Sequence, residues 1–310
     1  IVEALKADGP SSPADEILYI GGEGGLEREL VAREGLPFEA IQAGGVHGLG
    51  PLTIARNLWR LWRGFWRVLK RAGEWKPQAL LVTGGFVTAP VALACWLRRV
   101  PILVYLPDIE PAWAVKFTGA LAARIAVTAE ASRKYLTARK VVVTGYPLRR
   151  DLVNARGRRA EALAHFGLDP ERKTILVSGG SKGAQSLNRP FSRILDQVLE
   201  RWQVIHISGA TDADELRARR DQLSQERQAH YKLFLYLHSQ EMGLALAAAE
   251  VVISRSGAST LAEYPLMGLP AILSPYPFAW RYQKVNADYL AEQGAELVEL
   301  ERCLDRGECL

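Results

Sequence analysis

Residues 174–189 read TILVSGGSKGAQSLNR, an apolar run followed by small residues and then by a helix-like segment. The β-branched run at 174–178 is long enough for a buried parallel strand. In the small-residue turn at 179–183, backbone N–H groups can approach an anion closely, and the dipole of the following helix favours negative charge there. Ser181 adds a hydroxyl donor and Lys182 a positive charge. The order of strand, turn and helix therefore predicts a diphosphate site, with an unliganded tight turn as the alternative.

A second stretch repeats this order, because residues 251–269 read VVISRSGASTLAEYPLMGL. A strand is followed by small residues at 256–260 and by a helix that carries Glu263. Two such units in one half of a chain indicate a ligand crevice at the carboxyl ends of parallel strands. Glu263 is a suitable acceptor for two sugar hydroxyls, although a solvated glutamate near the start of a helix is the alternative. The first stretch has neither the spacing of a dinucleotide fingerprint nor that of a P-loop.

The rest of the chain alternates strands and helices, which indicates an α/β protein with parallel sheets. Its length of 310 residues suggests two domains. We place the hinge near 145–152, so that residues 1–148 form an N-terminal domain and residues 149–310 a C-terminal domain. The predicted strands lie at 16–20, 38–42, 79–83, 102–105, 125–128 and 141–144 in the first half, and at 174–178, 203–208, 232–236, 251–254, 271–274 and 296–300 in the second.

Composition excludes several classes of protein. No apolar run reaches about 18 residues without a charge, which argues against a membrane-spanning helix. The net charge of +5 is modest and no nucleic-acid motif accompanies it, so no nucleic acid is expected as a partner. Cys95, Cys303 and Cys309 show no metal or redox spacing, and the histidines give no metal pair at helical spacing. This spacing offers no metal site, and we expect neither a metal nor another cofactor.

Residues 52–71, LTIARNLWRLWRGFWRVLKR, combine arginines with aromatic residues and contain no acidic residue. At ~100° per residue, the basic side chains fall on one stripe of a helix and the aromatic side chains on the other side. This pattern is typical of an amphipathic helix at an anionic membrane surface. The alternative is a helix packed on a sheet, with its tryptophans in the core and its arginines in water. The candidate membrane residues are Trp59, Arg60, Trp62, Arg63, Trp66 and Arg67.

Two loops of the first half carry further candidates at the ends of predicted strands. Residues 84–90 read GGFVTAP, and Asp108 and Glu110 follow the strand at 102–105. Two carboxylates at the carboxyl end of a strand could take part in acid–base chemistry. Alternatively, Asp108 caps a helix that begins near Pro111.

Together these motifs resemble those of glycosyltransferase family 28, and in particular its peptidoglycan enzymes, over nearly the whole chain. The resemblance implies a GT-B fold, in which two Rossmann-like parallel-sheet domains face each other across a cleft. It also implies an inverting, metal-independent transfer of N-acetylglucosamine from UDP-GlcNAc to lipid-linked N-acetylmuramyl-pentapeptide. This reaction serves peptidoglycan synthesis, and hence cell-wall biogenesis, cell shape and cell division. The segments that carry the resemblance are Gly24-Gly25-Leu26-Glu27, residues 84–90, Gly179-Gly180-Ser181-Lys182-Gly183-Ala184 with Leu187-Asn188, Ser254-Arg255-Ser256-Gly257-Ala258 with Glu263, and Gln283 with Asn286-Ala287.

By matching motif positions, the resemblance implies roles for single residues. Arg149 and Ser181 would face the diphosphate, and Glu263 would hold the ribose. The backbone near Ser239 would meet the uracil, and Gln283 would touch the donor sugar. The complete donor-side set is Arg149, Gly180, Ser181, Lys182, Gly183, Ser239, Ser259, Thr260, Glu263 and Gln283, and the acceptor side comprises Gly84, Gly85, Phe86 and Thr88.

The chain also departs from the family pattern. The family's first glycine-rich loop, with the histidine often proposed as general base, would precede Ile1, which leaves Asp108 as the candidate catalytic residue. The family's His-Glu-Gln-Asn reads YLPD at 105–108, and its Asn-Pro-Val-Arg reads YPLR at 146–149. These departures affect the predicted identities of the donor sugar and the acceptor more than the predicted fold. We expect a chain truncated at both ends, without the first strand and glycine loop and without the final helices.

The resemblance further implies partners and a location. The partners would be UDP-GlcNAc, a polyprenyl-pyrophosphoryl muramyl-peptide and an anionic membrane surface. The protein would be peripheral, at the cytoplasmic face of the bacterial cell membrane. Two alternatives stay open: a related family 28 enzyme with another lipid acceptor, and a non-catalytic nucleotide-sugar-binding protein.

Overall fold

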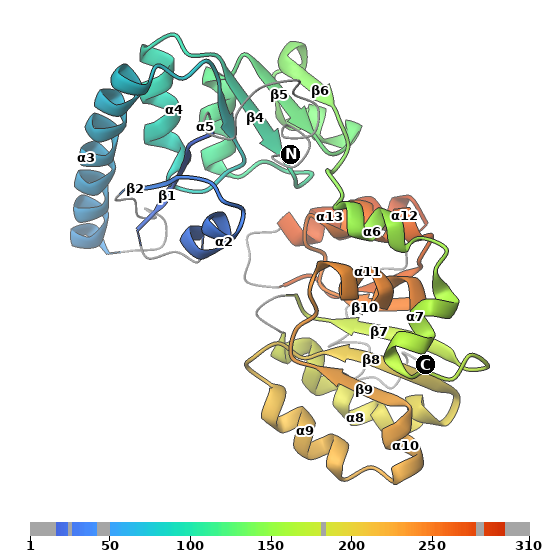
Figure 1. The fold of residues 1–310 in the computed structure, drawn as a ribbon. Coiled ribbons are helices and arrows are strands. Elements are labelled where there is room, and N and C mark those ends of the chain that lie inside the picture. Colours follow the sequence, from blue (N-terminus) through green and yellow to red (C-terminus); the bar gives the residue numbers. More distant parts are fainter. Residues whose placement is uncertain (1–16, 24–26, 42–49, 181–183, 277–281, 295–310) are drawn as a thin grey trace. The chain divides into compact units, whose positions relative to one another are not determined.

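The computed structural model describes residues 17–23, 27–41, 50–180, 184–276 and 282–294, and it divides into two compact units (Figure 1). The division along the chain falls between Thr144 and Gly145. The short segment Asp108–Glu110 belongs to the second unit, although the chain on both sides of it belongs to the first. Sequence reasoning did not anticipate this segment. The first unit is Ile1–Pro107 with Pro111–Thr144, and the second is Asp108–Glu110 with Gly145–Leu310.

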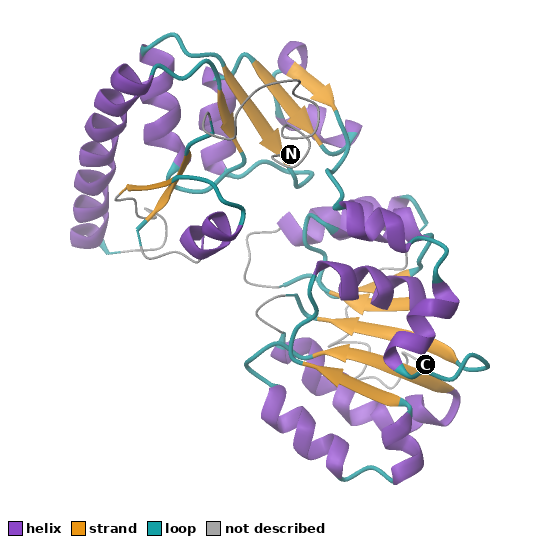
Figure 2. Ribbon diagram, in the orientation of Figure 1, coloured by secondary structure: helices purple, strands orange, loops and turns teal. Residues whose placement is uncertain are grey.

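The first unit contains parallel strands built from short apolar runs (Figure 2). Along β4, Ile102, Val104 and Leu106 are almost completely buried on one face, because alternate side chains of a strand point to the same side. β4 pairs with β3 and β5, which gives the order β3-β4-β5-β6, while β1 and β2 pair separately. The strands are β1 Tyr19–Gly22, β2 Phe38–Ile41, β3 Leu80–Val82, β4 Ile102–Leu106, β5 Arg124–Val127 and β6 Val141–Val143.

In the first unit, helices α4 and α5 pack on this sheet, and α3 packs on α4. The core of the four-stranded sheet includes Val115 of α5 and Ala92 of α4. A second apolar cluster joins Phe65 and Val68 of α3 to Val91 and neighbouring residues of α4. The long helix α3 is therefore held by one narrow apolar stripe, and the rest of its surface faces away from the core. The helices are α2 Glu27–Arg33, α3 Pro51–Trp75, α4 Thr88–Leu97 and α5 Trp113–Leu121, with 3-10 turns η2 Glu130–Tyr135 and η3 Ala138–Lys140.

The second unit is built around a five-stranded parallel sheet in the order β11-β10-β7-β8-β9. The central strand β7 pairs with β10 on one side and with β8 on the other. Its residues 174–178 are all buried, as expected for a parallel strand covered on both faces. The strands are β7 Lys173–Ser178, β8 Trp202–Ile207, β9 Tyr231–Phe234, β10 Val251–Ser254 and β11 Ala271–Leu273.

Helices of the second unit pack on this sheet. On α8, Leu187, Phe191 and Leu195 are completely buried and pack against residues of β7 and β8. Helix α11 packs against β7 and also contacts α6 and α7. The helices are α6 Arg150–Ala155, α7 Arg159–Phe166, α8 Gln185–Arg201, α9 Ala213–Asp221, α10 Gln225–Ala229, α11 Ser239–Ala248, α12 Thr260–Met267 and α13 Tyr282–Glu292.

The predicted strands are confirmed where the structure describes them, with ends that differ by at most three residues and with both ends of β10 as predicted. Residues 1–16, 24–26 and 296–300 lie outside the described part of the chain, so the strand predicted at 296–300 is not among the elements above. Helix α4 starts at Thr88. Pro90 is tolerated in its first turn, because the N–H group that proline lacks has no helical partner there.

A buried polar network lies beneath the start of α8. His206 of β8 is completely buried, with its Nε2 3.1 Å from Asn188 Oδ1 and its Nδ1 2.8 Å from the Tyr231 hydroxyl. Asn188 Nδ2 donates to Ser208 O at 2.9 Å and to Asp212 Oδ2 at 2.7 Å. Because Asn188 Oδ1 can only accept, His206 Nε2 carries the proton and Nδ1 accepts from Tyr231. The network fixes the first turn of α8, directly after the glycine-rich turn.

This network predicts a stability that depends on pH. Burial lowers the pKa of His206 from 6.5 to about 3. Between these two values the unfolded chain binds a proton at His206 that the folded chain does not, so the free energy of unfolding falls as the pH is lowered below 6.5. The slope is up to ~1.4 kcal/mol per pH unit, or roughly 2 kcal/mol between pH 6.5 and 5. Urea unfolding at pH 7.5, 6.0 and 5.0 measures it.

The matched variant is His206→Gln, which removes the titrating group and keeps a side-chain amide. At pH 7.5 it should be less stable than the wild type by about 1–3 kcal/mol, because the buried Tyr231 hydroxyl loses its acceptor. Its stability should nevertheless change less between pH 7.5 and 5.0 than that of the wild type. Equal pH slopes in the two proteins would contradict the assignment of a neutral His206.

Candidate functional site

The two strand–turn–helix units predicted from the sequence lie side by side in the second unit. Ser178 and Ser254, the last residues of β7 and β10, are register partners in the parallel pair. The turns that follow them therefore leave the same edge of the sheet from adjacent strands. Gly180 has a φ of +86°, a conformation that favours glycine. Residues 181–183, and with them the candidates Ser181, Lys182 and Gly183, lie outside the described residues.

A buried arginine connects the turn after β10 to the first turn of α8. Arg255 directly follows β10, and its Nη1 donates to Ser274 O at 2.8 Å and to Ser274 Oγ at 3.0 Å. Its Nη2 donates to the hydroxyl of Ser186 in the first turn of α8. This places a guanidinium group at the N-terminus of α8, where it adds to the positive end of the helix dipole. The sequence signal for Arg255 is a charged residue among small ones directly after a strand, and by itself this signal indicates no role.

Glu263 lies in the first turn of α12, at the same edge of the sheet. Ser259 Oγ donates to Glu263 Oε2 at 3.2 Å. Burial raises the pKa of Glu263, while the hydrogen bond from Ser259 and the positive charge of Arg149 act in the opposite direction. The predicted donor-side residue Thr260 is buried, and its hydroxyl donates to Gly257 O at 2.7 Å, so it stabilises the turn.

Arg149 and Tyr146 come from the segment that opens the second unit. Arg149 caps α6 through its backbone and has an exposed side chain. Burial raises the pKa of the Tyr146 hydroxyl, and the negative charges of Glu263 and Asp108 add to this effect, whereas Arg149 opposes it. Electrostatic effects of this kind require these side chains to lie in one region. In the sequence, Tyr146 is only a departure from the family pattern, and its place in this group is a finding of the structure.

Asp108 is held in this region by α13. Asn286 Nδ2 donates to Asp108 Oδ1 at 2.8 Å and to Ser256 O at 3.2 Å. Asn286 Oδ1 accepts from the N–H of Ile109 at 3.0 Å. Burial raises the pKa of Asp108, and the hydrogen bond from Asn286 partly offsets this rise.

Two further predicted donor-side residues lie at helix starts of the second unit. Gln283, in the first turn of α13, accepts from the N–H of Tyr276 at 2.8 Å through Oε1, and its backbone carbonyl accepts from the Ser256 hydroxyl at 2.7 Å. Ser239 is the first residue of α11. Its Oγ is buried and has no hydrogen-bond partner within the described part of the chain.

The predicted acceptor-side residues belong to the first unit and follow β3. Gly84 and Gly85 have φ values of +117° and +91°, which only glycine adopts without strain. Thr88 Oγ1 donates to Gly85 O at 2.7 Å and so closes the turn at the start of α4. Phe86 at the tip of this loop is exposed.

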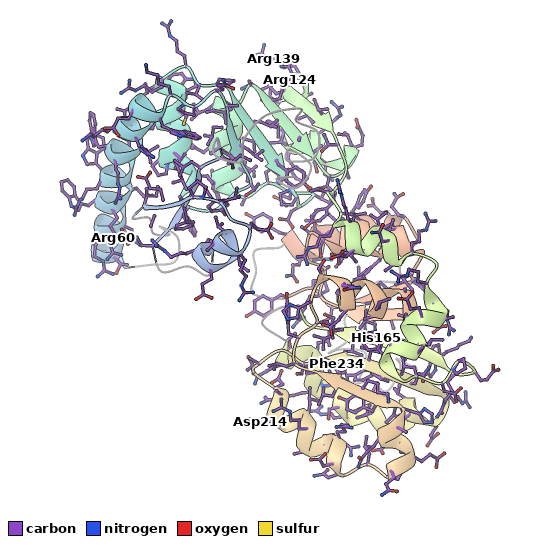
Figure 3. All side chains as sticks on the ribbon, in the orientation of Figure 1. Arg60, Arg124, Arg139, His165, Asp214 and Phe234 are labelled. Atoms are coloured by element: carbon purple, nitrogen blue, oxygen red, sulfur yellow. The ribbon has the colours of Figure 1, made fainter. Side chains whose placement is uncertain are left out.

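Helix α3 exposes aromatic and basic side chains together. Trp59, Trp62 and Trp66 are 61%, 53% and 52% exposed, whereas Phe65 and Val68 are 8% and 2% exposed. The alternative that placed the tryptophans in the core is therefore wrong: the core stripe is centred on Phe65 and Val68. We call the exposed set the α3 surface, and Figure 3 shows one of its members, Arg60, on α3. The α3 surface consists of Trp59, Arg60, Trp62, Arg63, Trp66 and Arg67.

The described residues contain neither a candidate membrane span nor a candidate metal cluster. Among them, no helix combines the length and the apolar character needed to cross a bilayer. Likewise, no three His, Cys, Asp or Glu side chains in these ranges gather closely enough to bind a metal ion.

Comparisons with known proteins place the chain in a family. The model of the glycosyltransferase family 28 N-terminal domain matches residues 1–127, and that of the family 28 C-terminal domain matches residues 174–309. The chain belongs to glycosyltransferase family 28. A relative from Roseiflexus sp. (strain RS-1), named UDP-N-acetylglucosamine--N-acetylmuramyl-(pentapeptide) pyrophosphoryl-undecaprenol N-acetylglucosamine transferase, is 41% identical, with 90% of this chain and 70% of the relative covered. A relative with the same name from Desulforudis audaxviator (strain MP104C) is 36% identical, with 97% and 81% covered.

Solved structures agree on the fold. The crystal structure of Acinetobacter baumannii MurG has a TM-score of 0.70 at 21% identity and covers 94% of this chain and 81% of its own. The UDP-GlcNAc 2-epimerase of Methanocaldococcus jannaschii has a TM-score of 0.63 at 14% identity, with 98% and 86% covered. The fold is therefore the GT-B type, with two Rossmann-like parallel-sheet domains. As a family 28 member, the chain is a glycosyltransferase.

Proposed function

We propose that the chain transfers N-acetylglucosamine from UDP-GlcNAc, with inversion, to lipid-linked N-acetylmuramyl-pentapeptide. The names of the family 28 relatives support both substrates. The observation that carries the proposal is the pair of adjacent turns after β7 and β10, with Glu263 and the charge of Arg149 at the same edge of the sheet. A nucleoside diphosphate matches this edge, because it offers an anion to one turn and ribose hydroxyls to the other.

The proposed chemistry is a displacement at the anomeric carbon. An acceptor hydroxyl oxygen forms the new bond, the bond from the anomeric carbon to the diphosphate oxygen breaks, and UDP leaves with the electron pair. Negative charge therefore develops on the diphosphate. The N-terminus of α8 and the guanidinium of Arg149 stabilise this charge. These groups can therefore stabilise the leaving diphosphate in place of a metal ion.

A base must take the proton from the acceptor hydroxyl. Asp108 is the candidate in this chain, and its pKa is raised by burial. A carboxylate with a raised pKa is a stronger base at neutral pH than an ordinary aspartate. Asp108 can alternatively accept a hydrogen bond from a sugar hydroxyl, as a carboxylate in place of the family's amide.

The acceptor is anchored in a membrane by its polyprenyl chain, so the enzyme must work at a lipid surface. We propose that the protein is peripheral and binds the anionic cytoplasmic face of the cell membrane through the α3 surface. Exposed tryptophans suit the interface between lipid and water, and arginines next to them suit anionic headgroups. Gly84, Gly85, Phe86 and Thr88 are the proposed acceptor-side residues of the first unit.

The proposed reaction is tested by incubating the protein with UDP-GlcNAc and the muramyl-peptide lipid and measuring UDP release and the disaccharide lipid. UDP-glucose and UDP-GalNAc serve as competing donors, and other polyprenyl diphosphate sugars as competing acceptors. Transfer to the muramyl lipid from UDP-GlcNAc is the expected result. Transfer to another lipid would favour the related family 28 activity, and UDP binding without any transfer would favour the non-catalytic alternative.

The ribose role predicts how Glu263→Ala changes ligand binding. The affinity for UDP should fall about 10-fold, because a carboxylate that accepts from ribose hydroxyls is lost, and hydrogen bonds to charged groups contribute ~1.5–3 kcal/mol before the cost of burying the carboxylate is subtracted. The affinity of Glu263→Gln for UDP should lie between those of Glu263→Ala and the wild type. Isothermal titration calorimetry with UDP measures the affinities.

Two ligands separate the ribose role from a general loss of structure. Pyrophosphate has no ribose, and 2′,3′-dideoxy-UDP has no ribose hydroxyls, so their affinities should change less than twofold in Glu263→Ala. An equal loss for UDP and for pyrophosphate would remove Glu263 from the ribose site.

A further inference from the structure

The amide of Asn286 is completely buried in α13, and described neighbours take up its hydrogen-bonding capacity. Its oxygen accepts from the N–H of Ile109, and the two hydrogens of Nδ2 go to Asp108 Oδ1 and Ser256 O. We propose that Asn286 is a positioning residue for the transfer reaction, which orients the carboxylate of Asp108 without touching either substrate. This inference rests on the proposed function, because it assumes that Asp108 contacts a reacting group.

The contacts fix which way the amide points. A backbone N–H faces one end of the amide, and a carboxylate oxygen and a carbonyl oxygen face the other. Only one orientation puts the oxygen at the donor and the NH₂ group at the two acceptors. Since Asn286 is 0% exposed, a ligand could reach its amide only by breaking these contacts.

Asn286 is itself held firmly in place. Ala287 and Leu290 on the same helix are buried, and Ser256 Oγ donates to the carbonyl of Gln283 one turn earlier at 2.7 Å. The loop after β10 is therefore attached to α13 by the Ser256 side chain and by the Ser256 carbonyl. A buried amide with fixed neighbours on all sides is a rigid support for a side chain in a site.

Through these contacts, Asn286 orients the carboxylate of Asp108. Its Oδ1 is taken by Asn286, which leaves Oδ2 as the oxygen for a sugar or acceptor hydroxyl. The Asn286 N–H group stabilises the charged form of the carboxylate, whereas burial destabilises it. The N–H of Ile109 fixes the backbone next to Asp108. The charge of Asp108 acts on the nearby hydroxyl of Tyr146, and Arg149 and Glu263 act on the same tyrosine.

A double-mutant cycle between Asn286 and Asp108 tests the inference. In the full chain, Asn286→Ala should lower kcat about 10-fold and change the KM for UDP-GlcNAc less than threefold. It should also move the acid limb of the kcat–pH profile to higher pH, because Asp108 loses the hydrogen bond that favours its charged form. In an Asp108→Ala background, Asn286→Ala should lower kcat less than twofold.

Three results would each overturn the inference: additive losses of kcat in the cycle, an acid limb of the kcat–pH profile that does not move, or a loss confined to UDP binding. Lys284→Ala is the matched control on α13, since Lys284 is exposed and pairs with Asp288 on the helix surface. It should leave kcat, the KM for UDP-GlcNAc and the kcat–pH profile unchanged. Asn286→Asp provides a second variant that keeps an acceptor for Ile109 and places a carboxylate against Asp108. It should raise the pKa of Asp108 further than Asn286→Ala does.

A measurement without turnover keeps the inference separate from the proposed function. Carboxyl-carbon NMR of aspartate-labelled protein, assigned with Asp108→Asn, reports the pKa of Asp108 directly. Asn286→Ala should raise this pKa, and an unchanged pKa would refute the positioning role even if no transfer is detected. A wild-type protein that shows no transfer would refute the proposed function, whereas transfer with an additive cycle would refute only the role of Asn286.

Discussion

Replacing Arg149 by alanine should weaken the binding of UDP about 10- to 100-fold. The Arg149 guanidinium is exposed and makes no hydrogen bond or ion pair with another side chain in the described ranges, while its positive charge acts on both Tyr146 and Glu263. A charged donor in that position is available for a diphosphate. A charge-assisted hydrogen bond contributes ~1.5–3 kcal/mol, and ~1.4 kcal/mol corresponds to a factor of ten in affinity. Titration calorimetry with UDP at constant ionic strength measures the loss.

Two comparisons make this result specific. Uridine lacks the diphosphate, so its affinity should change less than twofold in Arg149→Ala. Arg150→Ala removes the same charge one residue further along, at the first position of α6, and should change UDP binding much less. If Arg149→Ala binds UDP as the wild type does, or loses uridine and UDP equally, Arg149 does not face the diphosphate.

The framework of this site could be predicted from the sequence because it depends on local patterns. Short β-branched runs followed by glycine and serine define strands that end in tight turns, and parallel strands bring their carboxyl ends to one edge. This reasoning placed the turns after β7 and β10 and the helix that carries Glu263. The register Ser178–Ser254 then makes the two turns neighbours, which the sequence implied only through the general rule for parallel sheets.

Contacts between residues far apart in the chain could not be predicted in the same way. Asn286 and Asp108 are separated by 178 positions, and nothing in either segment signals the other. Arg255 was visible as a charged residue among small ones, but its bond to Ser186 depends on which strands are adjacent. The role of the segment Asp108–Glu110 in the second unit likewise follows from tertiary packing and not from any local motif.

Helix α3 shows where a helical wheel is informative and where it is not. The wheel separated basic from aromatic residues correctly, but it could not say which aromatic residues face the core. At ~100° per residue, Trp59, Trp62 and Trp66 lie between the arginine stripe and the stripe of Phe65 and Val68. Only the packing of α3 against α4 decides this, and it leaves all three tryptophans exposed.

This exposure leads to the prediction with the largest expected effect on membrane binding. Replacing Arg60, Arg63 and Arg67 together by glutamine should reduce binding to vesicles that contain anionic lipid about 30- to 100-fold. Each arginine near an anionic surface contributes ~1 kcal/mol, and the sum is lowered because Arg67 lies 3.5 Å from Glu39 and is partly neutralised. Co-sedimentation with vesicles of phosphatidylglycerol and phosphatidylcholine measures the partition.

The controls separate this surface from the general positive charge of the protein. Arg124, Lys134 and Arg139 carry the same charge on β5, η2 and η3 of the first unit, and Figure 3 labels Arg124 and Arg139 there. Replacing these three residues together by glutamine should reduce vesicle binding less than threefold. Binding of the wild type should fall at high salt, because exposed charges are screened, and on vesicles of neutral lipid. Trp59, Trp62 and Trp66 should give a blue-shifted fluorescence on anionic vesicles, since their exposed rings enter a less polar environment. Equal losses for the two triple variants would show that only net charge matters, and the α3 surface would then have no special part in binding the membrane.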